Sequence, residues 1–226
     1  MQQSEVLPDA AALAERAAAW LAAAITRTVA ARGQCSLAAS GGRTPWAMYA
    51  ALARQTDLPW ERVRLFQVDE RAAPPGHAER NLEGLRAALA PVAARLHWHP
   101  MPVEAEDLQT AAAHYTRELE AHCGMPPVLD LVHLGLGDDG HTASLIPGDS
   151  ALAAAECVAA TAPYKGWRRM TLTLPVLERA RQLLWVVAGA EKAAMLRRLL
   201  AADAGIPAGR VSQTRAVLLA DQASMT

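Results

Sequence analysis

The segment VLDLVHLGLG, residues 128–137, limits the folds open to this chain more than any other feature. It is almost continuously apolar and ends in glycines. A strand covered on one face alternates apolar and polar side chains, whereas a strand buried on both faces of a parallel sheet is apolar throughout. We therefore expect a parallel sheet with this segment near its middle.

Other short apolar segments alternate with longer helical ones. The expected strands cover residues 35–40, 62–70, 128–137, 169–174, 183–189 and 216–220. The expected helices cover residues 10–32, 44–55, 81–90, 108–122, 175–180 and 190–201. This alternation indicates an α/β fold, with a mostly parallel, Rossmann-like sheet and helices on both faces. Without an internal repeat or a linker, residues 1–226 are expected to form a single domain.

The composition limits the kinds of binding partner and the cellular compartment to be expected. The net charge of −1, with no basic stripe or acidic tail, argues against nucleic acid and anionic membranes as partners. The beginning of the chain lacks the pattern of a signal peptide, and the three cysteines form no CxxC pair. We expect a soluble, cytoplasmic protein, and no feature of the sequence sets an oligomeric state.

Ligands of open α/β sheets bind at the carboxyl ends of the strands. That rule points to the loops after Ser40, Asp69, Gly137 and Gly189. Each of these loops carries polar or charged residues, so we expect a binding site where they meet.

The first loop, SGGRTP, is a candidate phosphate site. Ser40 and the backbone N–H groups that follow would lie at a helix N-terminus, which favours an anion. Gly41 and Gly42 let the backbone approach a ligand, and Arg43 adds a cation. The alternative is an ordinary Gly-Gly turn with a solvated arginine.

The second loop, DERAAPPGHAERN, begins with Asp69, Glu70 and Arg71 at the end of a strand. These side chains would meet a ligand there, although three adjacent charges are also typical of an exposed surface. Asn81 could cap the next helix, and His77 is read as an ordinary loop histidine.

The third loop, GLGDDGHT, carries His141 two residues after Asp139 and three after Asp138, and Thr142 can begin a helix after it. A histidine is the residue type best suited to act as a general base near neutral pH, and one of the aspartates could orient its ring. The alternative is an aspartate-rich turn with a structural histidine. Late in the chain, four further basic residues add anion-binding potential: Lys165, Arg168, Arg169 and Lys192.

Metal and cofactor motifs are absent from the sequence. The pair HWH, residues 97–99, would place two imidazoles on one face of a strand, but no zinc-type spacing supports it. Neither GxGxxG, a P-loop nor GxSxG occurs. We predict no metal and no cofactor.

Five motifs in order resemble the 6-phosphogluconolactonases: SGGRTP, VDER followed by ERN, LGLGDDGHTASLIPG, RRMTLT and GAEK. The resemblance spans about residues 35–192. It implies a hydrolase of carbohydrate metabolism with an α/β sheet core, which converts 6-phospho-D-glucono-1,5-lactone to 6-phospho-D-gluconate in the oxidative pentose phosphate pathway. The implied partner is a small sugar-phosphate lactone.

The resemblance also implies roles for particular residues. His141 would take a proton from the attacking water, Asp139 would orient it, and Arg71 would contact the carbonyl or the phosphate. The family's usual ESN reads Glu79-Arg80-Asn81 here, which puts a role for position 80 in doubt but not one for Asn81. The expected substrate- and phosphate-binding residues are Ser40, Gly41, Gly42, Arg43, Asp69, Asn81, Arg169 and Lys192.

Two alternatives remain. The related glucosamine-6-phosphate deaminases share the phosphate loop and a GDGH corner, but their catalytic glutamate falls at Ile146 here. The other alternative is a non-catalytic sugar-phosphate sensor, which would keep the phosphate-binding groups without needing His141.

Overall fold

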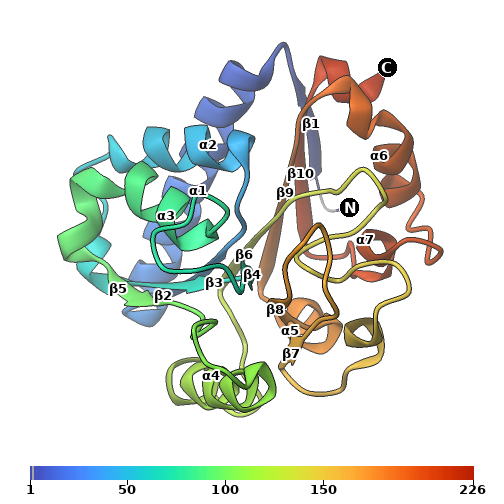
Figure 1. Ribbon diagram of the computed structural model, residues 1–226. Coiled ribbons are helices and arrows are strands. Elements are labelled where there is room, and N and C mark those ends of the chain that lie inside the picture. The colour runs from blue at the N-terminus through green and yellow to red at the C-terminus, as the bar shows by residue number, and fades with distance from the viewer. Residues whose placement is uncertain (2) are drawn as a thin grey trace.

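A computed structural model describes residue 1 and residues 3–226 (Figure 1). Its centre is a parallel sheet of seven strands in the order β1-β10-β9-β6-β2-β3-β5. The strands are β1 (Gln3–Leu7), β2 (Cys35–Ala39), β3 (Val63–Gln67), β5 (His97–His99), β6 (Leu131–Leu134), β9 (Gln182–Val187) and β10 (Ala216–Asp221). As predicted from its unbroken apolar run, β6 lies in the middle of the sheet, between β2 and β9.

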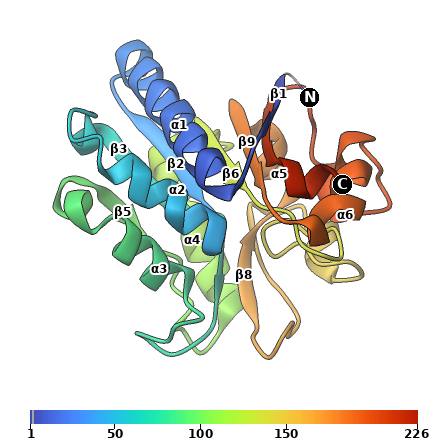
Figure 2. The same cartoon turned by 90° about the horizontal axis from the view of Figure 1, so that it is seen from above.

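Helices cover both faces of this sheet. One core forms against α1 (Ala10–Arg32), α2 (Arg43–Ala53) and α3 (Asn81–Ala88). The other forms against α4 (Leu108–Cys123), α5 (Leu174–Arg179), α6 (Ala193–Leu200) and α7 (Pro207–Arg210). In Figure 2, α1 and α2 lie side by side along the sheet. Short 3-10 helices complete the chain: η1 (Trp60–Arg62), η2 (Ala90–Arg95), η3 (Ser150–Ala153), η4 (Ala190–Lys192) and η5 (Gln222–Met225). The α/β prediction is confirmed.

A second, antiparallel sheet of three strands was not expected. It has the order β4-β8-β7, with β4 (Asp69–Arg71), β7 (Val158–Ala160) and β8 (Arg169–Leu172). The single strand expected over residues 62–70 is therefore wrong, because the chain changes sheets at Val68. The Val68 N–H donates to the Ala39 carbonyl at 3.0 Å, and the Val68 carbonyl accepts from Leu172 N at 2.8 Å. An apolar pattern cannot reveal this change, since both sheets are buried here.

Three further expectations need correction. The strands β1, β5 and β7 were missed, because each is short or has little apolar periodicity. The central strand is shorter than residues 128–137, since the chain turns as soon as the glycines begin. Thr142 does not begin a helix; it pairs with Leu145 in an isolated bridge instead.

The central strand carries a buried histidine. His133 is fully buried, and its Nδ1 lies 3.1 Å from the Tyr49 hydroxyl of α2. Burial lowers the pKa of His133 from its ordinary value of 6.5 to about 3. The imidazole is therefore neutral in the folded protein across the neutral range.

Within residues 1 and 3–226, no helix combines the length and the apolar character that a bilayer crossing requires.

We expect this histidine to make the fold sensitive to acid. The unfolded chain binds a proton at His133 below pH 6.5 and the folded chain does so only near pH 3, so stability falls as the pH drops through this window. The loss is up to about 1.4 kcal/mol per pH unit. Urea unfolding at a series of pH values measures the slope.

Replacing His133 and Tyr49 together by Phe should flatten that slope, because the ionisable group and its hydroxyl partner are then both removed. His114→Phe is the matched control, since that histidine is exposed on α4. An unchanged slope in the double variant would contradict the assignment.

Candidate active site

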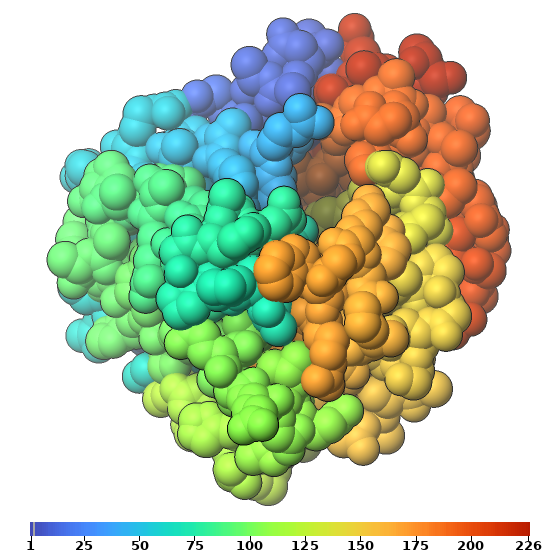
Figure 3. All heavy atoms as spheres, viewed as in Figure 1, coloured from blue at the N-terminus to red at the C-terminus, as the bar shows by residue number. Residues whose placement is uncertain are grey.

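A cavity of about 260 Å³ lies at the carboxyl edge of the parallel sheet. It corresponds to the hollow in Figure 3 between the teal segment around residues 70–80 and the orange segment around residues 160–170. All four loops expected from the strand ends contribute to its wall. The lining residues are Ser40, Gly41, Gly42, Asp69, Arg71, Asn81, Gly135, Leu136, Gly137, Asp138, His141, Ala143, Lys165, Arg169 and Lys192.

His141 is held at the cavity wall by Asp139. The Asp139 Oδ1 atom lies 2.5 Å from His141 Nδ1 and accepts the His141 backbone N–H at 3.1 Å. The other carboxylate oxygen accepts the Tyr164 hydroxyl at 3.0 Å. Partial burial opposes ionisation of Asp139, but these hydrogen bonds outweigh it and lower its pKa. The carboxylate stays charged and keeps the proton of the imidazole on Nδ1, which leaves Nε2 with a free lone pair.

The glycine at 137 is a steric requirement of this arrangement. A Cβ atom at that position would lie 2.0 Å from His141 Nδ1. The ring can therefore fold back over the end of β6 only because residue 137 has no side chain.

Asp138 has a different partner. Its carboxylate forms an ion pair with the Lys192 ammonium group, and this hydrogen bond lowers the pKa of Asp138. The two adjacent aspartates thus point to different groups, with Asp139 on the histidine and Asp138 on the lysine.

Arg71 and Arg169 are brought together by the small sheet. They occupy directly opposed positions of β4 and β8, a cross-strand arrangement that is unfavourable for like charges. Desolvation lowers the pKa of Arg169, and the Arg71 charge adds to this effect. The Nε atoms of both side chains are buried and find no hydrogen-bond acceptor among the residues that the structure describes. A bound anion between the two arginines would offset the repulsion of their charges and would supply acceptors for the two Nε–H groups.

Asp69 and Asn81 line the same cavity as the two arginines. Asn81 Nδ2 donates to the Asp69 carbonyl at 3.0 Å, and the Ser144 hydroxyl donates to Asp69 Oδ2 at 2.5 Å. The Asn81 Oδ1 atom is buried and unpaired among the described residues. It packs so closely on Gly41 that a Cβ there would lie 1.9 Å away.

The Glu70 carboxylate is fully buried and binds backbone N–H groups next to these lining residues. One oxygen accepts the N–H groups of Arg71 at 2.8 Å and Asn81 at 2.7 Å. The other accepts Leu82 N–H and the Gln67 amide, both at 2.8 Å. Glu70 therefore caps the N-terminus of α3 from outside the helix, and the expectation that Asn81 is itself the cap is wrong.

The SGGRTP loop leads into α2 as expected. Gly42 is the residue that precedes the helix, and no side chain caps the free N–H groups of its first turn. Ser40 lines the cavity, but its hydroxyl donates to the His133 carbonyl at 3.0 Å. Arg43 is exposed and lines an adjacent hollow of about 220 Å³ instead.

Two contributors, Tyr164 and Ser144, were missed as site residues, and Lys165 was expected only as a cation with anion-binding potential. Lys165 and Gly166 form a two-residue hairpin turn between Tyr164 and Trp167, in which Lys165 has a φ of 48°. The turn brings Lys165 over the cavity, with its Nζ 5.4 Å from the Tyr164 ring centroid. The Lys-Gly pair was the available sequence signal for such a turn. Ser144 carried no signal, because only the fold brings it to Asp69.

The cavity combines a histidine–aspartate pair with four cations and two acids among its lining residues, Asp69 and Asp138. A family profile described as glucosamine-6-phosphate isomerases/6-phosphogluconolactonase matches residues 8–220. The chain belongs to this family.

Two family relatives and one solved structure illustrate the similarity. The 6-phosphogluconolactonase of Synechocystis sp. is 39% identical over 208 residues, covering 89% of this chain and 86% of the relative. The 6-phosphogluconolactonase of Pseudomonas putida is 35% identical over 205 residues, covering 87% of this chain and 83% of the relative. The solved 6-phosphogluconolactonase from Trypanosoma cruzi has a TM-score of 0.88 at 25% identity, covering 99% of this chain and 96% of that one.

The role of Glu70 can be tested by Glu70→Gln. An amide keeps the shape but presents donors to backbone N–H groups. It also removes one of the two carboxylates that pair with the buried Arg80, at 3.5 Å, and leaves only that of Glu104, at 3.1 Å. We expect a loss of about 3–5 kcal/mol in the free energy of unfolding, measured by denaturant titration. Glu79→Gln, at an exposed carboxylate of the same loop, should cost little. Equal stability of the two variants would contradict this role.

Proposed function

We propose that the chain hydrolyses 6-phospho-D-glucono-1,5-lactone to 6-phospho-D-gluconate in the oxidative pentose phosphate pathway, without a metal or cofactor in the reaction. The observation that carries the proposal is the Asp139–His141 pair at the wall of a cavity that also holds Arg71 and Arg169. Membership of the family and the names of its relatives support the same reaction class.

In the proposed reaction His141 acts as a general base. Its Nε2 takes a proton from water as the water oxygen attacks the lactone carbonyl carbon. The tetrahedral oxyanion then collapses, the ring C–O bond breaks, and the protonated histidine returns its proton to the leaving hydroxyl oxygen. Asp139 stabilises the transient imidazolium through the 2.5 Å contact. A positioned base contributes about 10²–10⁴-fold to a rate, and a δ-lactone is already an activated ester.

The cations divide between the two ends of the substrate. We assign the 6-phosphate to the free N–H groups after Gly42 together with the cations near them, of which Lys192 lines both adjoining hollows. Arg43 is placed to assist from the outer hollow. Arg71 and Arg169, on the small sheet, are then available to the carbonyl oxygen as negative charge develops on it.

The deaminase alternative has less support. The position of the deaminases' catalytic glutamate is Ile146, which is buried and apolar. The sensor alternative leaves unexplained why Asp139 and Tyr164 should hold the His141 ring in place. Ammonia release from glucosamine 6-phosphate, or binding of sugar phosphates with no effect on lactone lifetime, would identify either alternative.

Replacing His141 by Ala should lower kcat/KM for the lactone by about 10²–10⁴-fold, because the base is lost while the cations remain. The decay of freshly generated 6-phosphogluconolactone at fixed pH and low buffer concentration measures it. His114→Ala, on the exposed face of α4, is the control and should leave the rate unchanged. Binding of 6-phosphogluconate should survive in both variants. Wild-type turnover in His141→Ala would contradict the assignment of the base.

Tyr164→Phe tests the positioning of the base. Loss of the hydroxyl frees one oxygen of Asp139, raises the pKa of this carboxyl group and loosens the imidazole. We expect kcat to fall roughly 2- to 10-fold, with KM little changed and the acidic limb of the pH–rate profile moved to higher pH.

Lys165→Ala removes the neighbouring cation of the same turn, so it should raise KM more than it lowers kcat. A Tyr164→Phe variant that changed only KM would show that the hydroxyl contacts substrate and does not position the base.

A further inference from the structure

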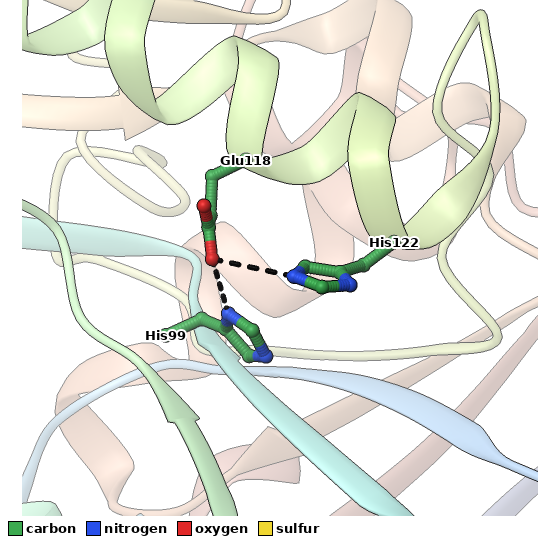
Figure 4. A group of neighbouring side chains, drawn as sticks. All are labelled: His99, Glu118 and His122. Atoms are coloured by element: carbon green, nitrogen blue, oxygen red, sulfur yellow. Dashed lines mark hydrogen bonds and ion pairs between the residues drawn. The ribbon is translucent and has the colours of Figure 1, made fainter.

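Three side chains outside the active-site cavity meet at a single oxygen atom. Glu118 and His122 lie one turn apart on α4, and His99 ends β5 (Figure 4). Glu118 Oε1 is 2.7 Å from His99 Nδ1 and 3.4 Å from His122 Nε2. The three ligand atoms lie within 4.8 Å of one another. Of the residues that the structure describes, no others form such a group.

We propose that His99, Glu118 and His122 form a binding site for Zn²⁺, with water as the fourth ligand. Two imidazole nitrogens and one carboxylate oxygen form a donor set that suits this ion. Neither the reaction proposed above nor the cavity lining, taken over residues 1 and 3–226, uses any of the three side chains.

The observed distances are close to what a tetrahedral ion requires. Zinc–ligand bonds of 2.0–2.2 Å place neighbouring atoms of a tetrahedral ligand set roughly 3.3–3.6 Å apart. The Glu118–His122 pair already has this spacing, at 3.4 Å. The Glu118–His99 pair, at 2.7 Å, must open by roughly 0.6–0.9 Å, and the two imidazoles must close around the ion. Rotations of the side chains of Glu118 and His122, which are only partly buried, supply that adjustment.

The third ligand is already fixed in place. The His99 side chain is only 9% exposed, and its ring stacks on Phe66 with centroids 4.5 Å apart and an interplanar angle of 11°. The Tyr115 hydroxyl of α4 also donates to the His99 carbonyl at 2.8 Å. The strand end and the helix therefore keep their spacing without an ion, so little ordering is needed to bind one.

The way these side chains are paired also suits a cation. In the absence of an ion, two imidazoles with centroids 4.5 Å apart must share one oxygen. A divalent cation at this point satisfies all three electron-pair donors at once.

The site differs from the metal pattern considered in the sequence. The HWH pair was judged as His97 with His99, but His97 Nε2 contacts the Glu61 carbonyl at 3.0 Å. His99 instead meets residues 19 and 23 positions further along the chain. No short spacing motif could have revealed this arrangement.

The test is metal binding by the full-length protein after removal of metal by chelator and dialysis. Isothermal titration with Zn²⁺ should give one site per chain, and Co²⁺ should give the visible absorption of a four-coordinate ion. A hundredfold excess of Zn²⁺ over Kd should raise Tm by about 5–10 °C. The absence of any binding would overturn the proposal.

Variants locate the site. His122→Ala and the conservative Glu118→Gln should each weaken Zn²⁺ binding by about a hundredfold or more, since loss of even a supporting group costs about 10–100-fold. His97→Ala, on the same strand, and His141→Ala, in the cavity, are matched controls and should bind as the wild type does. Circular dichroism verifies that each variant is folded. If His141→Ala lost Zn²⁺ binding, or if both His122→Ala and Glu118→Gln kept it, the ion would lie elsewhere and the proposal would be overturned.

Discussion

The candidate site depends most on the hydrogen bonds that the buried Glu70 carboxylate accepts. A charge with no solvent contact is tolerated only when donors surround it, and here three backbone N–H groups and the Gln67 amide do so. The same hydrogen bonds fix the end of β4 and the start of α3. Arg71 and Asn81, which both line the cavity, are therefore positioned by a group that is not part of the cavity lining.

The two sheets contribute different parts of the chemistry. The parallel sheet brings its strand ends together, so it supplies the His141 corner and the free N–H groups that begin α2. The small antiparallel sheet sets Arg71 directly opposite Arg169. A chain with a net charge of −1 thereby concentrates positive potential at one point.

The sequence predicted the parallel sheet and the loops of the site because both depend on local signals. The apolar run of β6 is readable by itself. So are the two ends of α1, because Asp9 caps the helix by accepting the Ala12 N–H and Gly33 ends it in a left-handed conformation. The second sheet was missed because it depends on pairing between residues about a hundred positions apart. For the same reason the sequence left open which aspartate orients His141, whereas the structure shows Asp139 on the ring and Asp138 on Lys192.

Gln67 connects the rear of the site to the edge of the sheet. Its amide donates to Glu70 at 2.8 Å and its Oε1 accepts Met101 N–H at 2.9 Å, while its own N–H donates to the Tyr115 hydroxyl at 3.0 Å. Tyr115 in turn holds the His99 carbonyl. The candidate zinc ligands and the support of Arg71 therefore share one buried hydrogen-bond network. Because that network is already closed without an ion, zinc would add stability to α4 and β5 without being needed to build the cavity.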